Sequence, residues 1–147
     1  MSTNSVVIET QASGSVGRSI WAVFAGFLAV FILSLGTDEI LHLMRVYPPW
    51  SQTMSDGLFW LATFYRTIYG ILGSYITARL APRRPMKHAL IGALIGMVLA
   101  TAGAVATWNH EPPLGPHWYS VILIVEALPT AWLGAWLHMR STAQRLV

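Results

Sequence analysis

The sequence contains no cysteine and few charged residues. Of its 147 residues none is Cys, and only 10% are Asp, Glu, Lys or Arg. The absence of cysteine excludes disulfides, cysteine-ligated zinc and thiol catalysis. A soluble globular domain carries about 25% charged residues, so this chain has too little charge to cover a surface of ordinary polarity. We expect a single domain from the length.

Nucleotide-binding and hydrolase signatures are also missing. The chain shows no P-loop, no dinucleotide-binding glycine pattern and no G-x-S-x-G motif. What the chain has instead is apolar surface, because 54% of its residues are hydrophobic and the mean hydropathy is +0.54. This composition excludes a disordered chain and predicts an integral membrane protein. We expect no cofactor.

Four apolar runs are each long enough to cross a bilayer, whose core takes about 20 helical residues. We place the spans at residues 20–46, 57–80, 86–108 and 117–138. Together they predict an all-α, four-helix transmembrane bundle over residues 20–140. The polar segment 1–19 is expected to be a flexible cytoplasmic tail, and residues 141–147 a cytoplasmic C-terminal tail.

Local signals mark the ends of the spans. Pro48 and Pro49 are expected to end the first helix, because proline cannot donate to the helical ladder. Thr53 and Asp56 have the spacing of a capping box that opens the second helix. Pro85 suits the first turn of the third.

Basic residues predict the orientation. The side that carries both termini holds seven of the nine: Arg18, Arg79, Arg83, Arg84, Lys87, Arg140 and Arg145. Only Arg45 lies on the other side, and Arg66 lies within a span. Because cytoplasmic loops are enriched in Lys and Arg, both termini are predicted in the cytoplasm, as in a protein of a bacterial cytoplasmic membrane. The basic pI therefore reports topology, and the expected partner is the lipid bilayer rather than nucleic acid.

Aromatic residues gather near the outer ends of the spans, where amphipathic rings favour the membrane interface. They are Tyr47, Trp50, Trp60, Trp108, Trp118 and Tyr119. Such a belt predicts anchoring and no ligand role.

A short internal similarity links the second and fourth spans. LGSYITAR at 72–79 and LGAWLHMR at 133–140 share three identical positions. The match favours two parallel-related helical hairpins about an axis along the membrane normal, an arrangement found in transporters. The alternative is a chance match between apolar helices.

Small residues predict where helices approach closely. Gly70 and Gly73 mark such a face on the second span, and Gly92 and Gly96 on the third. Two uses remain open, namely packing inside one bundle and a homo-oligomer formed through Gly92 and Gly96.

Five ionisable residues lie in the outer third of the predicted bundle and are expected to form a buried charge cluster. They are Asp38, Glu39, His42, Arg66 and Glu126. Arg66 needs an acidic partner in lipid, and we expect Asp38 or Glu126. Crowded carboxyls favour a protonated member, which suits proton relay or substrate coupling. Pro129 is expected to kink the fourth span beside Glu126. The alternative is an ion pair that only sets helix register.

A metal site is a weaker hypothesis. Glu39 and His42 share one helical face as Glu-x-x-His, but carboxylate-bridged di-metal bundles need two such motifs and two further Glu. The candidate ligands are Asp38, Glu39, His42, His110 and His117. Otherwise these side chains are simply solvated at the membrane surface.

The layout is similar to that of the small multidrug-resistance transporters, short four-span proteins with a membrane-embedded glutamate. Those carry the glutamate in the first helix, in a motif absent from this chain, so the resemblance covers layout alone. Two functions are carried forward. One is a small proton- or ion-coupled transporter-like protein, expected to be oligomeric, and the other is a non-catalytic accessory or structural subunit. Neither requires an enzyme.

Overall fold

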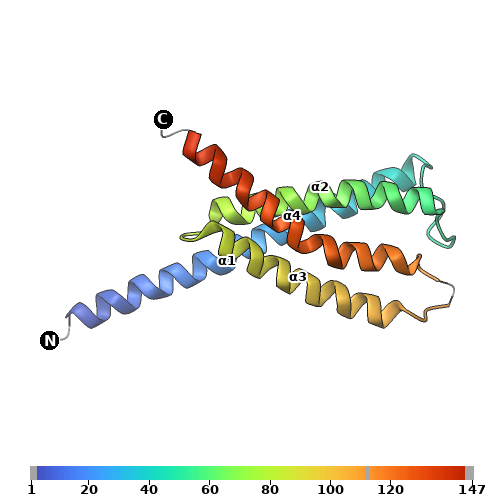
Figure 1. Ribbon diagram of the computed structural model, residues 1–147. Helices are drawn as coiled ribbons and strands as arrows, with labels where there is room; N and C mark the ends of the chain where they lie inside the picture. Colours follow the sequence, from blue (N-terminus) through green and yellow to red (C-terminus); the bar gives the residue numbers. More distant parts are fainter. Residues whose placement is uncertain (1–2, 112, 145–147) are drawn as a thin grey trace.

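The protein is a bundle of four helices in the computed structural model, which describes residues 3–111 and 113–144, with side chains from Val16 onward (Figure 1). The helices are α1 (Thr3–Leu43), α2 (Asp56–Leu80), α3 (Pro85–Thr107) and α4 (His117–Gln144). The described part of the chain contains no strand. The predicted all-α bundle of four helices is confirmed.

Three of the helices are long and apolar enough to cross a membrane, which indicates an integral membrane protein. They are α1 over Val16–Leu43, α3 and α4. The 25 residues of α2 are long enough, but the helix is more polar. It also contacts each of the other three helices. Its Thr63, Tyr65 and Thr77 are buried, so the neighbouring helices shield these polar groups from the surroundings.

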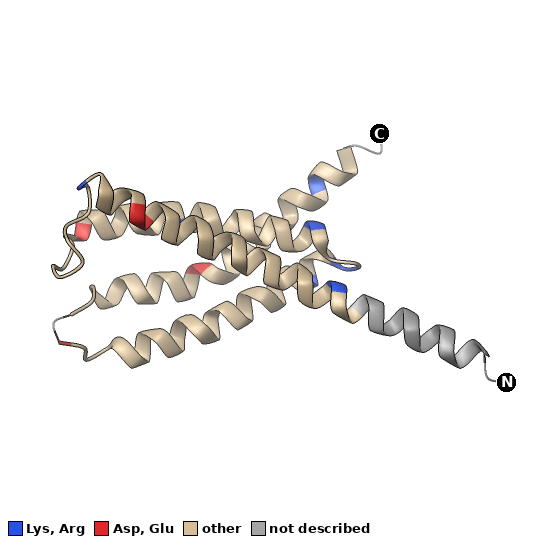
Figure 2. Ribbon diagram, turned by 180° about the vertical axis from the view of Figure 1, so that it is seen from behind, with Lys and Arg blue, Asp and Glu red and all other residues tan. Residues whose placement is uncertain are grey.

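The two hairpins, α1–α2 and α3–α4, run in the same sense and meet mainly where α2 packs on α4 (Figure 1). Among the described residues α1 and α4 share no contact. Both termini and the α2–α3 turn lie at one end of the bundle, and the two longer loops, 44–55 and 108–116, lie at the other. Lys and Arg gather at the first end (Figure 2), so we call these the basic end and the loop end.

Both bounds of α1 differ from the expected span 20–46. The helix begins at Thr3 and so takes up residues 3–19 of the tail expected to be flexible, while residues 1 and 2 lie outside the described residues. No proline precedes Pro48 to stop it. It ends at Leu43 in a Schellman motif, with the Arg45 amide donating to His42 O (3.0 Å) and the Val46 amide to Leu41 O (2.9 Å). Arg45 takes the left-handed conformation (φ 59°), so the helix ends before it reaches Pro48.

The start of α2 corrects the predicted capping box. Ser55 is the N-cap and makes no side-chain capping bond. The hydroxyl of Thr53 donates instead to Pro113 O at 3.1 Å, in the other loop. Thr53 therefore ties the two hairpins together at the loop end. Pro85 does occupy the first position of α3, as predicted.

The fourth helix continues through the predicted end at 138 and through much of the expected C-terminal tail, as far as Gln144. Pro129 lies inside it, and α4 bends in its middle (Figure 1). Proline cannot donate to the carbonyl of Val125. The next residue, Thr130, turns its hydroxyl back to Glu126 O at 2.8 Å, so the backbone beside Glu126 is held by a side chain.

Glycines allow close contact along α2. A Cβ on Gly73 would lie 2.8 Å from Gly26 O of α1, and a Cβ on Gly134 of α4 would collide with Ile71 O of α2. Gly73 and Gly134 are the matched positions of the internal similarity, yet Gly73 packs on α1 whereas Gly134 packs on α2. The sequence similarity therefore does not correspond to equivalent contacts.

The glycine face of α3 points into the bundle. A Cβ on Gly92 would meet Val23 of α1 at 3.6 Å, and one on Gly96 would meet Phe27 at 3.5 Å. Both are ordinary contact distances, so this side is loosely packed. This face therefore takes part in packing within one bundle, and a homo-oligomer through Gly92 and Gly96 stays a prediction. A Cβ on Gly70 of α2 would lie 3.2 Å from the hydroxyl oxygen of Thr130 on α4.

Candidate functional site: two carboxyls beside an inter-hairpin cavity

An ion pair between Asp38 and Arg66 joins α1 to α2. Nη2 of Arg66 lies 2.6 Å from Oδ2 of Asp38. The other carboxylate oxygen, Oδ1, accepts a hydrogen bond from the hydroxyl of Tyr65. Asp38 is 9% exposed, so a buried carboxylate has a charged donor on one oxygen and a phenol on the other. Such charge-assisted bonds are the strong class of hydrogen bond.

A second tyrosine extends this network into the loop after α1. The hydroxyls of Tyr47 and Tyr65 lie 3.1 Å apart. Because the Tyr65 hydroxyl donates its proton to Asp38, the Tyr47 hydroxyl is the donor in its bond with Tyr65. Burial raises the pKa of Tyr47 above its ordinary value, so its phenol stays neutral and keeps donating. We call Asp38, Arg66, Tyr65 and Tyr47 the Asp38 network.

Arg66 also faces α4. Its guanidinium carbon lies 5.8 Å from the centroid of the Tyr119 ring, within the range of a cation–π contact. Its Nε is buried and has no hydrogen-bond partner. Arg66 thus has one donor that the protein leaves unused, although most buried polar groups are paired.

Glu126 is held differently. Its Oε2 lies 2.6 Å from the hydroxyl of Thr67 on α2, and that hydroxyl lies 2.8 Å from Thr63 O. Within the described residues Arg66–Asp38 is the sole ion pair. Glu126 is therefore close to α2 but is not paired with Arg66, and it is half-buried.

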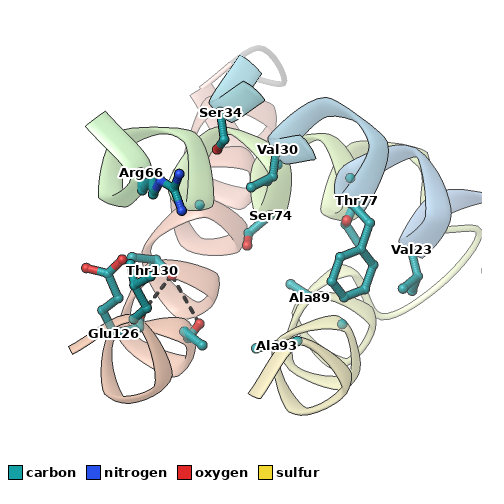
Figure 3. A pocket seen from close by; sticks show the side chains of 18 residues that line it. Val23, Val30, Ser34, Arg66, Ser74, Thr77, Ala89, Ala93, Glu126 and Thr130 are labelled. Atoms are coloured by element: carbon teal, nitrogen blue, oxygen red, sulfur yellow. Dashed lines mark hydrogen bonds between the residues drawn. The ribbon is translucent and has the colours of Figure 1, made fainter. Parts of the chain in front are cut away.

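A cavity of about 260 Å³ separates the hairpins and receives side chains from all four helices. Its polar lining consists of Ser34, Arg66, Ser74, Thr77, Glu126 and Thr130, and the rest is apolar or glycine. Arg66 and Glu126 stand on one side of it, and Val23, Ala89 and Ala93 on the other (Figure 3). Glu126 is the only carboxyl among the lining residues.

The predicted cluster of five ionisable residues is not formed. Asp38 and Arg66 meet, and Glu126 lines the same cavity as Arg66. Glu39 is exposed, because one residue along a helix turns the side chain by about 100° and Asp38 takes the face toward α2. His42 stacks on Trp50 at 3.8 Å between ring centroids. Of the two acids proposed for Arg66, the partner is Asp38.

The described part of the chain gives the metal hypothesis no support. No group of three or more His, Asp or Glu side chains there could hold an ion. The ring of His117 stacks on Trp108 at 4.0 Å, and its Nε2 lies 3.1 Å from Trp108 O. His42 and His117 are therefore each stacked on a tryptophan.

Sequence reasoning missed the hydroxyl groups of the site. Tyr47 and Tyr119 are predicted as interface anchors, but Tyr47 is 3% exposed and Tyr119 lies against Arg66. Thr67 reaches Glu126. The available signal is the clustering of Thr63, Tyr65 and Thr67 around Arg66, since a buried arginine needs polar neighbours.

Comparison with protein-family models, with curated protein sequences and with solved structures finds no match for this chain. The likeness to small multidrug-resistance transporters therefore stays one of layout.

Proposed function

We propose that this protein crosses the cytoplasmic membrane four times and binds a proton at Glu126, on the wall of a ligand cavity, as a small proton-coupled transporter-like protein. The observation that carries the proposal is the contact of Glu126 with Thr67, next to the cavity. An ionisable side chain inside a membrane span is by default a functional candidate.

Hydrogen-bond counting supports a protonated Glu126. A threonine hydroxyl has one proton to donate, yet the Thr67 oxygen lies within bonding distance of both Thr63 O and Glu126 Oε2. If Glu126 were ionised, both neighbours would be acceptors and one contact would lack a proton. A protonated Glu126 donates to Thr67, which then donates to Thr63 O, so both bonds are made.

The structural alternative fits the other carboxyl better. Asp38 has a donor on each oxygen and little exposure. A buried pair of this kind sets the register between helices. We therefore assign the Asp38 network to architecture and Glu126 to coupling.

The connectivity of the helices supports the four-span arrangement. The 25 residues of α2 extend about 37 Å, more than the ~30 Å of a bilayer core, and they join the loop end to the basic end. The enrichment of Lys and Arg at the basic end supports a cytoplasmic position for that end. A reporter that works only in the cytoplasm should be active when it is fused after Val147, and a reporter that works only after export should be inactive there. The opposite pair of results would reverse the proposed orientation.

A pH jump tests the proton site without a known substrate. A proton that moves from the bulk to a mid-span carboxyl displaces charge across part of the membrane. Proteoliposomes on a solid-supported membrane should give a transient current on a pH step. Glu126→Gln should abolish it. Glu39→Gln, the same change at an exposed carboxyl, should leave it intact, and a current that survives Glu126→Gln would overturn the proposal.

A further inference from the structure

We propose that the cavity between the hairpins binds a single-chain amphiphile with an anionic headgroup, and that this anion and the proton on Glu126 bind together. The inference rests on the proposed function, because it takes Glu126 as the proton site, and it adds the chemistry of the ligand.

Unused donors mark the headgroup position. Nε of Arg66 is buried without a partner. The hydroxyls of Ser34 and Ser74 also make no hydrogen bond within the described protein, and both residues line the cavity (Figure 3). Two hydroxyls that can donate and the side chain of Arg66 therefore border one space. Ser34 and Ser74 are half-buried, so their hydroxyls stay open to the cavity and can donate to a ligand with several acceptor oxygens.

Apolar side chains mark the position of the tail. From Ser34 toward the basic end, the cavity follows α1 past Val30, Phe27 and Val23. The eleven residue-to-residue steps from Ser34 to Val23 extend about 16 Å along the helix, which is longer than an octyl chain. Glycine and alanine on α3 form the facing wall. A small, mostly apolar cavity with a few convergent polar groups is typical of a ligand site.

The charges around Glu126 favour an anion only when Glu126 carries its proton. Arg66 of α2 faces it but is neutralised by Asp38 of α1, and Tyr119 of α4 is a neutral phenol beside Arg66. The third helix has no titratable residue between His88 and Thr107. An ionised Glu126 would make the cavity negative and repel an anion. A protonated one leaves it neutral and rich in donors, so proton and anion each strengthen the binding of the other.

Octanesulfonate is the probe, because a sulfonate stays ionised at every pH used. Its affinity is measured by calorimetry with the full chain in nanodiscs of neutral phospholipid, and empty nanodiscs are subtracted. In the wild type, affinity should be constant at low pH and fall by up to tenfold per pH unit above the titration of Glu126. In Glu126→Gln, which mimics the protonated form, it should stay high at every pH.

Two serine variants test the donors without touching the ion pair. Ser34→Ala and Ser74→Ala should each lower the affinity for octanesulfonate by about tenfold, which is the expected loss for one hydrogen bond to a charged group. Octanol and octyltrimethylammonium provide the neutral and cationic comparisons. Binding of octanol as tight as that of the sulfonate, or preferential binding of the cation at high pH, would overturn the inference.

The two proposals fail in different ways. If the pH-jump current depends on Glu126 but octanesulfonate does not bind at any pH, the anionic ligand is wrong and the proton site stands. If octanesulfonate binds equally at every pH and the pH-jump current is unchanged in Glu126→Gln, the proton site is wrong. The proposed coupling between proton and anion binding is then wrong as well.

Discussion

Two carboxyl groups inside the bundle, those of Asp38 and Glu126, contact the same helix, α2, but their hydrogen bonding differs. Asp38 meets α2 through a guanidinium and a phenol, one on each oxygen. Glu126 meets α2 through one threonine hydroxyl that another acceptor shares, and it borders the cavity. The difference separates a carboxylate whose hydrogen bonds are complete from a carboxyl whose protonation can change. The first builds the fold, and the second is the better candidate for function.

The packing around the two carboxyls shows the same contrast. At α2, glycines bring α1 and α4 into backbone contact, whereas Gly92 and Gly96 leave α3 loosely set against α1. Asp38 belongs to the α1–α2 contact. Glu126 lies where α4 meets α2 and borders the cavity. Asp38 is therefore absent from the cavity lining, whereas Glu126 is part of it.

The largest effect is expected from breaking the Asp38 network. Arg66→Ala leaves a buried carboxylate without its cation and should lower the free energy of unfolding by about 3 kcal/mol. Thermal unfolding in detergent measures it, with the exposed Arg83→Ala as a control that should change stability by less than about 0.5 kcal/mol. The double variant Asp38→Leu/Arg66→Met should be more stable than Arg66→Ala alone. Equal stability of Arg66→Ala and Arg83→Ala would remove the architectural role.

The next effect sharpens the contrast in packing. Gly134→Ala forces a Cβ against the backbone of α2 and should destabilise by about 1–3 kcal/mol. Gly96→Ala meets only the Phe27 ring at 3.5 Å, so it should be neutral or stabilising, because alanine favours a helix by about 1 kcal/mol over glycine. The same unfolding assay compares them. Similar losses of stability in both variants would mean that α4 packs on α2 no more tightly than α3 packs on α1.

A smaller effect is expected at Thr67, which connects α2 to Glu126. Thr67→Val keeps the shape but leaves the Glu126 carboxyl without its partner, at a cost of about 1–2 kcal/mol. Thr101→Val is the matched control, because Thr101 is exposed and its hydroxyl also bonds to a carbonyl four residues back, Met97 O, at 2.7 Å. Thr67→Val should also move the pH range of the pH-jump current. If both valine variants behave alike, the Thr67–Glu126 bond contributes nothing.

The smallest change in stability is expected for Glu126→Gln. An amide can make the same bond with Thr67 as a protonated carboxyl, so the free energy of unfolding should change by less than about 1 kcal/mol. Asp38→Asn removes the anion from an ion pair and should cost clearly more. Side-by-side unfolding curves at neutral pH make the comparison. A greater loss for Glu126→Gln than for Asp38→Asn would reverse the roles assigned to the two carboxyls.

Much of the secondary structure follows from local signals in the sequence. Apolar runs of span length predict four helices, and Pro85 marks the start of α3. Helix ends that depend on backbone geometry are harder to predict from the sequence. The first helix stops at a left-handed Arg45, a conformation that arginine seldom adopts, so the proline pair after it gives a later end than the observed Leu43. Thr53 matches a capping box by spacing, but its hydroxyl bonds across to the other loop.

The candidate site divides in the same way. The sequence indicates Asp38, Arg66 and Glu126, because an ionisable residue in an apolar run is conspicuous. It cannot assign partners, because a rotation of one residue turns Asp38 inward and Glu39 outward. Tyr47 and Tyr119 look like interface anchors, since the same amphipathic ring suits both a membrane surface and a buried hydrogen bond.

The scarcity of charge and the long apolar runs by themselves determined the class of this protein, and the sorting of its basic residues predicts its orientation. Both depend on the cost of moving groups from water into lipid, which is a property of composition and order along the chain. Only the tertiary structure decided which carboxyl is neutralised and which is left beside a cavity. That choice depends on helix rotation and on the glycine contacts that draw α1 and α4 onto α2 while α3 stays apart from α1.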